Sequence, residues 1–424
     1  MTVDTLCVQG GWQPKKGEPR QVPIYSSTTF KYETSQQMSD LFDLKEAGYF
    51  YTRLANPTND QVAKKIAALE GGVAAMLTSS GMAASAFAVM NICEAGDHVV
   101  ASAQIYGGTF NLFAVSLKKL GIETTFVDPE ASPATIAKAF KPNTKCLFGE
   151  TVANPSGVVL DIAKFAKIAH KFGVPLIVDN TFPTPILCRP FEFGADIVTH
   201  ATTKYMDGHS SQVGGCIVDS GNFDWTKYPE RFAGLVAPDP SYHGLSYTKN
   251  FGKLAYITKC TAHLMRDFGA IPSPFNAFLL NLGLESLHVR IRRHAESALT
   301  VAKWLKKQPK VAWVKFAGLP DSPYNPLVKK QFKGNSPCGV MTFGIKGGRE
   351  QSIKFMDSLK LIGIVTHVAD AWSCVLHPAS HTHRQLTDEQ LKEAGIPPDL
   401  IRLSVGLEDP KDLIEDLKQA LKKV

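Results

Sequence analysis

The chain has 424 residues, of which 44% are hydrophobic and 20% are charged, and its formal net charge at pH 7 is +7. This length and composition predict a large buried core in more than one domain, and no apolar run reaches the roughly 20 residues that cross a bilayer. The positive charge is spread along the chain without dense basic patches, so we expect no membrane and no nucleic-acid partner.

The first 60 residues predict an arm rather than a domain, because they are polar and turn-rich and lack a periodic apolar face. Residues 1–20 lack the apolar stretch of a signal peptide and carry Lys15, Lys16 and Arg20. We therefore expect a soluble, cytoplasmic protein.

Residues 60–220 alternate between short apolar runs and helix-like stretches such as Ile136–Phe140 and Ile162–Phe172. Strands too apolar to face water, alternating with helices, predict a mostly parallel sheet that is covered on both faces. Ligands bind such sheets at the carboxyl ends of the strands. The expected strands are Ala74–Thr78, His98–Ala101, Thr124–Val127, Cys146–Glu150, Leu176–Asp179, Asp196–His200 and Gly215–Val218.

The remainder of the chain predicts a long connection and a second domain. Residues 221–255 are rich in proline, glycine and aromatics, which indicates a functional loop or an interface segment. A helical pattern over residues 282–306 opens the second domain, which continues with a strand at Val340–Phe343 and helices at Ser352–Ser358 and Leu413–Leu421. The eight cysteines have no CxxC spacing, so we expect buried free thiols and no metal site.

Lys204 follows the predicted strand Asp196–His200 after a short run of small and hydroxyl residues. A lysine delivered from the end of a core strand is poorly solvated, which favours its neutral amine. A neutral amine is what a carbonyl cofactor such as pyridoxal phosphate needs to form a Schiff base. From this stretch alone, a lysine that emerges into solvent after the strand is the alternative.

Two other strand ends are candidates for the same cofactor site. The turn Ser79-Ser80-Gly81 leads into a helix whose first N–H groups can bind phosphate, although such turns are also ordinary helix caps. Asp179 ends an apolar strand, where its carboxylate can pair with a protonated pyridine nitrogen or cap a turn.

Two side chains could hold a ring and a carboxylate. Tyr106 lies in a glycine-rich loop, where it can stack on a flat ring or simply pack. Arg402 alternates within an apolar, strand-like run, and its guanidinium can bind a carboxylate or face solvent from an edge strand.

These features occur in the chain order of fold-type-I pyridoxal-phosphate enzymes. The chain resembles the Cys/Met metabolism family of these enzymes from about residue 8 to its end, and within it the O-acetylhomoserine sulfhydrylase branch. The family motifs appear as Tyr51–Thr58, Ser79–Met82, Asp179–Thr181, Thr202–Lys204 and Arg402–Gly406. The branch is indicated by Gly48–Tyr51, Pro238–Gly244 and His377–His383.

The resemblance implies a role for each of these residues. Lys204 would form the Schiff base and shuttle protons, Asp179 would pair with the pyridine nitrogen, and Tyr106 would stack on the ring. Arg402 and Asn154 would hold the substrate carboxylate and the edge of the cofactor.

The resemblance also implies which residues bind the phosphate of the cofactor. Backbone N–H groups of Gly81 and Met82, with Thr203, would bind it from the same chain. Tyr51 and Arg53 would reach the phosphate of a neighbouring subunit, and Tyr51 would join Tyr106 in assisting with protons.

The implied architecture is an α/β fold-type-I transferase with a mostly parallel seven-stranded sheet and a smaller C-terminal α+β domain. We expect an arm at residues 1–60 that contacts a neighbouring subunit, a cofactor-binding domain at 61–260 and a C-terminal domain at 261–424. The expected assembly is a homotetramer, a dimer of dimers with shared active sites.

The implied activity is γ-replacement on O-acetyl-L-homoserine by sulfide or a small thiol, which gives homocysteine or methionine and acetate. Within the family, cystathionine γ-synthase, γ-lyase or a secondary-metabolism enzyme with another nucleophile is the alternative. A non-catalytic member that serves as a scaffold or regulator is a further one.

Three positions depart from family patterns. Ala201 stands where a serine usually donates to the phosphate, at an expected cost of about 1.5–3 kcal/mol in cofactor affinity. Trp372 follows the stretch Thr366–Ala371, where the branch normally has arginine. Gly108 stands where methionine γ-lyases carry a cysteine, which argues against that activity.

Overall fold

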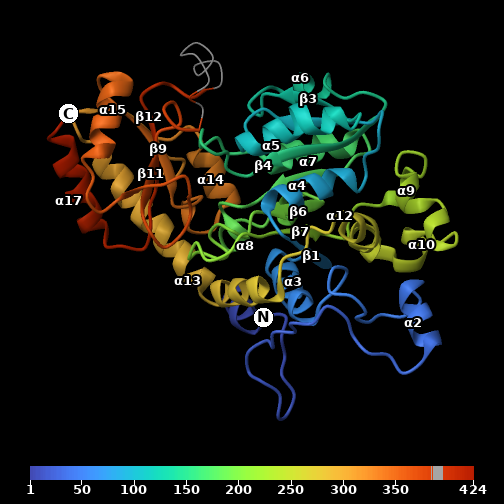
Figure 1. Cartoon of the computed structure of the whole chain (residues 1–424). Helices are drawn as coiled ribbons and strands as arrows, with labels where there is room; N and C mark the ends of the chain where they lie inside the picture. The colour runs from blue at the N-terminus through green and yellow to red at the C-terminus, as the bar shows by residue number, and fades with distance from the viewer. Residues whose placement is uncertain (383, 385–394) are drawn as a thin grey trace.

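The computed structural model of the chain describes residues 1–382, 384 and 395–424, and it contains two sheets that lie side by side (Figure 1). The larger sheet has seven strands in the order β1-β7-β6-β5-β4-β2-β3, and the smaller has five in the order β10-β11-β12-β9-β8. In the larger sheet β7 pairs antiparallel with β1 and β6, and the other neighbours are parallel. The predicted fold class, α/β with a mostly parallel seven-stranded sheet and a smaller C-terminal part, is confirmed.

The strands of the larger sheet lie within two residues of the predicted ones. Successive side chains alternate between two apolar layers, so that in β5 Leu176 and Val178 join one layer and Ile177 the other. Burial on both faces is why these strands read as continuous apolar runs. The strands are β1 Ala74–Thr78, β2 His98–Ser102, β3 Glu123–Val127, β4 Thr144–Glu150, β5 Leu176–Asp179, β6 Ile197–His200 and β7 Gly215–Asp219.

Helices cover both faces of this sheet. One layer is closed by α3 (Pro57–Glu70), α7 (Ile162–Lys171) and the start of α13 (Pro274–Leu305). The other is closed by α4 (Gly81–Met90) and α11 (Ala255–Cys260). The carboxyl ends of the parallel strands are therefore left as the open edge of the layers, which is where ligands bind in such folds.

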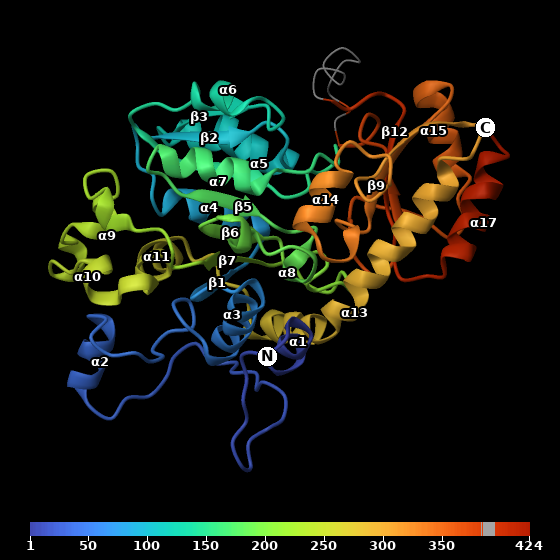
Figure 2. The same cartoon turned by 180° about the vertical axis from the view of Figure 1, so that it is seen from behind.

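Helix α13 joins the two halves of the molecule. It runs diagonally from beneath the larger sheet to the smaller one (Figures 1 and 2). It begins at Pro274, eight residues before the predicted start, because the Ser273 side chain accepts a hydrogen bond from Asn276 N and the proline occupies the first turn.

The smaller sheet packs against its own helices around a third apolar cluster, in which the Phe343 and Phe355 rings meet edge to face. The predicted strand at Val340–Phe343 and the helices at Ser352–Ser358 and Leu413–Leu421 are present with longer bounds. The elements are β8 Val311–Lys315, α14 Asn325–Gln331, β9 Val340–Ile345, α15 Gly348–Asp357, β10 Gly363–Ile364, β11 Cys374–Leu376, β12 Leu400–Ser404 and α17 Pro410–Leu421.

Two regions are more ordered than their sequences predict. Helix α1 (Val3–Gln9) packs on α3 and α13 through the buried Cys7. Residues 221–255 form short helical turns that bury Trp225 and Tyr247 rather than one irregular loop.

The remaining elements are short. The α-helices are α2 Ser35–Phe42, α5 Gly107–Asn111, α6 Pro133–Ala137, α8 Thr184–Leu187, α9 Ala233–Val236, α10 Tyr247–Phe251 and α12 Arg266–Phe268. The 3₁₀ and π turns are η1 Leu112–Leu117, η2 Pro190–Phe193, η3 Trp225–Lys227, η4 Pro240–Tyr242, η5 Gly252–Leu254, η6 Thr261–Met265 and η7 Lys333–Asn335.

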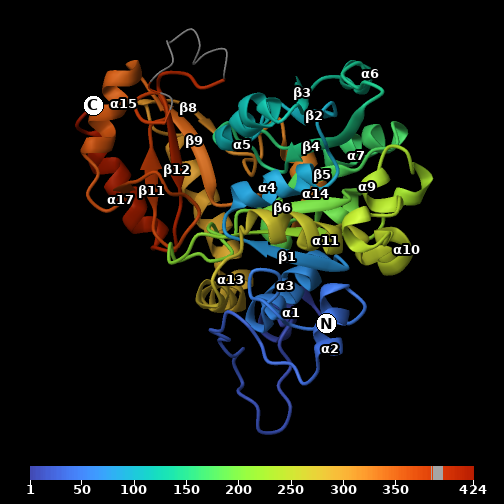
Figure 3. The same ribbon diagram turned by 45° about the vertical axis from the view of Figure 1, so that its right-hand side comes forward.

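The segment between α1 and α2 extends away from both sheets (Figure 3). In the described part of the chain, no helix has the length and apolar content needed to cross a bilayer. All eight cysteines are buried and free, as their spacing predicts. The domain limits at residues 60 and 260 stay predictions.

Candidate active site

A cavity of about 260 Å³ lies at the carboxyl ends of β4, β5 and β6. The structure brings to it every predicted site residue except Tyr51 and Arg53. These lining residues are Gly81, Met82, Tyr106, Asn154, Asp179, Thr203, Lys204 and Arg402. They come from six separate segments of the chain, which the strand ends and the loop before β11 place around one space.

Lys204 is partly buried in the turn that follows β6, and its Nζ atom lies 3.4 Å from Nδ1 of His367. The pKa of the Lys204 amine is lowered to about 8, chiefly by burial and next by the Arg402 guanidinium, while the Asp370 carboxylate partly opposes both. The amine is therefore partly neutral near physiological pH, as attack on a carbonyl requires. The alternative of a solvent-exposed lysine is wrong.

Asp179 ends β5 and faces the cavity. Its Oδ1 atom accepts hydrogen bonds from N and Oγ1 of Thr181, at 3.0 and 2.5 Å, and burial raises the pKa of its carboxyl group. No described lysine, arginine or histidine forms an ion pair with it. A buried carboxylate without a cation is costly, and the N–H of a protonated pyridine ring would fill that need.

The first turn of α4 forms a cradle of backbone donors. Ser80 caps the helix by accepting from Ala83 N at 3.1 Å, while the N–H groups of Gly81 and Met82 have no intrahelical partner. A Cβ atom on Gly81 would lie 2.5 Å from Cβ of Ala201, so only glycine lets the helix approach this closely. The cradle and its dipole fit a phosphate.

Thr203 and Ala201 complete this side of the cavity. The Thr203 hydroxyl donates to Gly214 O at 3.1 Å and accepts from Gly214 N at 3.0 Å, so its proton is directed at a carbonyl. Ala201 N donates to Oγ1 of Thr181, which ties this turn to Asp179. The donor set and Asp179 together fit pyridoxal phosphate.

Tyr106 and Glu150 meet on the opposite wall. Tyr106 N donates to Oε2 of Glu150, and Tyr106, which also lines the cavity, is 47% exposed. A Cβ atom on Gly108 would lie 2.5 Å from the Tyr106 ring, so a cysteine there would displace this ring. Because Gly108 has no side chain, the Tyr106 ring fits in its present position.

Arg402 and Asn154 lie together at the far end of the cavity. The guanidinium donates to Oδ1 of Asn154 at 3.2 Å and to the carbonyl oxygen of His367 at 2.9 Å. Arg402 is buried in β12, between β11 and β9, so the alternative of a solvent-facing edge strand is wrong. It has no carboxylate partner among the described residues, which suits it to a substrate carboxylate.

Tyr51 and Arg53 lie outside the cavity of their own chain. The Arg53 guanidinium sits 5.1 Å from the centre of the Tyr51 ring. Their expected action on the phosphate of a neighbouring subunit stays a prediction.

Sequence reasoning assigned no role to four residues of this site. Glu150 and Thr181 line the cavity, while His367 contacts Lys204 and lies beside Asp370. Glu150 gave a usable signal, since it ends a predicted strand as Asp179 does. His367 and Asp370 reach the site through the tertiary fold.

The remaining sequence motifs lie around this centre. Trp372 is 75% exposed on the loop before β11, and its backbone N–H donates to Oδ1 of Asp370. The branch motif His377–His383 begins in the described chain, but His383 lies outside the described residues.

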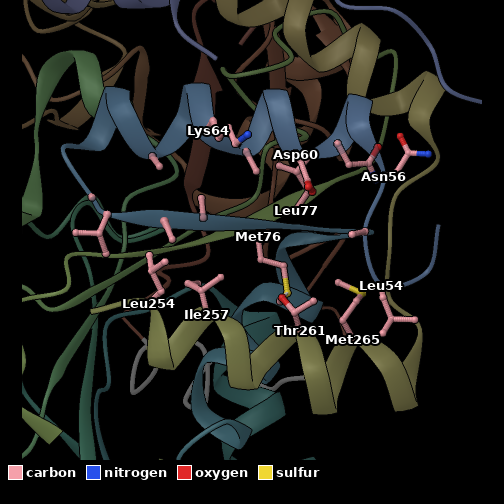
Figure 4. A pocket seen from close by; sticks show the side chains of 18 of the residues that line it. Leu54, Asn56, Asp60, Lys64, Met76, Leu77, Leu254, Ile257, Thr261 and Met265 are labelled. Atoms are coloured by element: carbon pink, nitrogen blue, oxygen red, sulfur yellow. Dashed lines mark hydrogen bonds between the residues drawn. The ribbon is translucent and has the colours of Figure 1, made fainter. Parts of the chain in front are cut away.

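A larger cavity of about 600 Å³ lies elsewhere, along the edge of the larger sheet between α3 and the α11–η6 helix (Figure 4). Met76 of β1 points toward Ile257 and Met265, while Leu77 lies on the other face of the strand, toward α3. Its lining is mostly apolar and contains none of the predicted site residues. The predicted site residues therefore gather in the smaller cavity.

The chain is similar to known proteins over nearly its whole length. Residues 4–422 match the family described as Cys/Met metabolism PLP-dependent enzymes. An O-acetyl-L-homoserine sulfhydrylase from Leptospira meyeri is 42% identical over 430 residues, covering 99% of this chain and 97% of its own. A homocysteine synthase from Schizosaccharomyces pombe is 45% identical over 420 residues, with the same two coverages.

A solved structure extends the likeness to the whole fold. A Campylobacter jejuni protein assigned as an O-acetylhomoserine (thiol)-lyase superposes with a TM-score of 0.96 at 37% identity, covering 100% of both chains. That structure carries a pyridoxyl phosphate group on a lysine at position 205 of its own numbering.

Proposed function

The chain belongs to the Cys/Met metabolism PLP-dependent enzymes, and from that premise we propose that it catalyses γ-replacement on O-acetyl-L-homoserine. Sulfide or a small thiol takes the place of the γ-acetate, and homocysteine or methionine is released with acetate. One observation carries the proposal: Lys204, Asp179 and Arg402 face the same cavity, and none has an ion-pair partner among the described residues.

Each of these three side chains then binds one group of the cofactor or the substrate. Lys204 would hold the cofactor covalently, Asp179 would pair with its pyridine nitrogen, and the first turn of α4 would bind its phosphate. Tyr106 stacks on the ring. Arg402, with Asn154 beside it, binds the α-carboxylate of the amino acid.

The residues of this chain act on the substrate's protons. Bound pyridoxal phosphate supplies an electron-poor ring that stabilises negative charge on the amino acid. The Lys204 amine would take and return the Cα proton of the bound amino acid. Arg402 fixes the carboxylate so that Cα stays within reach of Nζ.

We propose in addition that Tyr51 and Arg53 bind the phosphate of a neighbouring subunit, in a homotetramer with shared active sites. Both residues lie outside the cavity of their own chain, which supports this role. Residues 1–60, 61–260 and 261–424 serve as arm, cofactor-binding domain and C-terminal domain. The cytoplasm is the proposed location.

The decisive experiment incubates the purified protein with pyridoxal phosphate and O-acetyl-L-homoserine, with and without sulfide, and measures homocysteine, acetate and 2-oxobutyrate. Homocysteine that depends on sulfide is expected. A γ-lyase would instead release 2-oxobutyrate without a thiol, and a non-catalytic member would release nothing.

Two variants connect the activity to the site. Lys204→Ala is expected to abolish both turnover and the borohydride-reducible cofactor attachment. Lys249→Ala, an exposed lysine in α10, is the matched control and is expected to retain both. Full turnover by Lys204→Ala would refute the assignment.

A further inference from the structure

The His367 side chain contacts the amine of Lys204, and no role has been given to it so far. Its Nδ1 atom lies 3.4 Å from Nζ of Lys204, and its Nε2 atom lies 3.6 Å from Oδ2 of Asp370. The three groups thus form a row of amine, imidazole and carboxylate that begins at the cavity.

The backbone holds this row in place. Ala369, between His367 and Asp370, has a φ of +68°, a conformation that bends the chain and costs a non-glycine residue about 1–2 kcal/mol. Its N–H is fixed by Oγ of Ser404 at 2.8 Å, and Arg402 binds the carbonyl oxygen of His367. The bend turns the imidazole and the carboxylate toward each other.

The Asp370 carboxylate is anchored independently. Its Oδ2 atom accepts from the Ser210 hydroxyl and its Oδ1 atom from Trp372 N at 3.0 Å. The Nε2 atom of His367 is buried and has no hydrogen-bond partner at standard distances. A buried polar atom that faces a fixed carboxylate needs only a shift of a few tenths of an ångström to donate to it.

Several charges face the imidazole. The pKa of His367 is lowered, chiefly by burial and next by Lys204, with a smaller contribution from Arg402, while the carboxylates of Asp370 and Asp207 act in the opposite direction. The resting imidazole is therefore neutral, with Nδ1 free to accept from Nζ. When a proton arrives, the adjacent carboxylates stabilise the imidazolium.

We propose that His367, held by Asp370, is a catalytic residue that exchanges protons with the amine of Lys204 during turnover. In this step the Nζ ammonium gives a proton to Nδ1, which leaves a neutral amine and an imidazolium whose Nε2–H points at Asp370; the reverse step restores both. The inference rests on the proposed function, because γ-replacement requires proton removal at both Cα and Cβ. A single amine carries one extra proton at a time, so a neighbour that accepts it frees Lys204 to act again.

The test uses the holoenzyme and L-2-aminobutyrate, which has the carbon skeleton of the substrate but no γ-acetate to lose. Exchange of its Cα and Cβ hydrogens with D₂O is followed by proton NMR for wild type, His367→Asn and Asp370→Asn. His243→Asn, whose side chain is 85% exposed, is the matched control. Cofactor absorption and steady-state kcat and KM are measured on the same samples.

The expected result is that His367→Asn keeps its cofactor spectrum and a KM within about 3-fold, while kcat falls about 10- to 100-fold, at the low end of general acid–base effects. Cβ exchange should fall more than Cα exchange, and Asp370→Asn should show the same pattern more weakly. His243→Asn should match wild type.

The proposal is overturned if His367→Asn exchanges both hydrogens at wild-type rates, or if it loses Cα and Cβ exchange in equal proportion together with its cofactor. The second outcome would mark a structural role. The exchange readout needs no leaving group, so it judges the relay even if wild type fails to turn over O-acetylhomoserine, which would refute the proposed function alone.

Discussion

Glu150 and Asp179 end neighbouring parallel strands and lie directly opposite each other in the register of β4 and β5. Both side chains line the same cavity. Burial, and next the Asp179 carboxylate, raise the pKa of Glu150 well above its usual range. Two carboxyl groups enclosed in one cavity cannot both ionise cheaply; the pKa of Asp179 is raised as well, but the rise is larger for Glu150, so we expect the shared proton on Glu150.

Two substitutions of Glu150 distinguish the contribution of its hydrogen-bond acceptor from that of a negative charge. Glu150→Gln keeps the acceptor for Tyr106 N and should hold the cofactor dissociation constant within about 3-fold. Glu150→Ala removes that acceptor, at a cost of about 1–3 kcal/mol, so affinity should fall roughly 10- to 100-fold. Fluorescence titration of the apoenzyme with pyridoxal phosphate measures both. Equal damage in the two variants would mean that Glu150 acts as an anion.

The buried amine of Lys204 makes the stability of the apoenzyme depend on pH. Its pKa is about 8 in the folded chain against 10.5 when exposed, so between these values the unfolded state binds the extra proton and stability rises with pH. Below pH 8 the folded chain bears the full cost of about 3 kcal/mol, at about 1.4 kcal/mol per pKa unit.

Lys204→Met removes that cost. The variant apoenzyme should exceed wild type in unfolding free energy most at pH 7.5, and the difference should shrink by about 2 kcal/mol by pH 9.5. Urea unfolding at the two pH values measures it. Lys249→Met is the exposed control and should show no such trend. A pH-independent difference would show that the amine titrates normally.

The sequence predicts the larger sheet well because its strands are buried on both faces, and their apolar runs end on the residues that line the cavity. Asp179 and Lys204 are examples, since each is the polar residue that follows such a run. Helix α1 was missed because Val3, Leu6 and Cys7 give only one apolar turn, and they gain their packing from α13.

The role of His367 could not be identified from the sequence, for a different reason. It lies 163 residues from Lys204, in a loop without periodicity, and its position depends on the bend at Ala369 and the bond to Ser404. The resemblance singled out the stretch Thr366–Ala371, which contains His367, but only the tertiary structure shows that this side chain contacts Lys204.

Adding a hydroxyl group at Ala201 tests the location of the phosphate site. Its side chain lines the cavity beside the first turn of α4, so Ala201→Ser places a hydroxyl next to the cradle formed by Gly81 and Met82. One new hydrogen bond to a charged group is worth about 1.5–3 kcal/mol, so cofactor affinity should rise roughly 10-fold or more. Equilibrium dialysis measures it, with Ala237→Ser, exposed and outside the cavity, as control. Unchanged affinity would place the phosphate elsewhere.

Gly81→Ala tests the same phosphate site by adding a methyl group that blocks the close approach of α4 to Ala201. The new Cβ would lie 2.5 Å from Cβ and 2.7 Å from Cα of Ala201, so α4 must move away from the turn that carries Lys204. Overpacking of this kind costs about 1–3 kcal/mol, and the displaced N–H groups should weaken cofactor binding as well. Gly363→Ala is the matched control, since no atom lies within 4 Å of its added Cβ. Thermal unfolding of the apoenzyme and pyridoxal phosphate titration should both change for Gly81→Ala and neither for Gly363→Ala; loss of stability with unchanged cofactor affinity would refute the cradle.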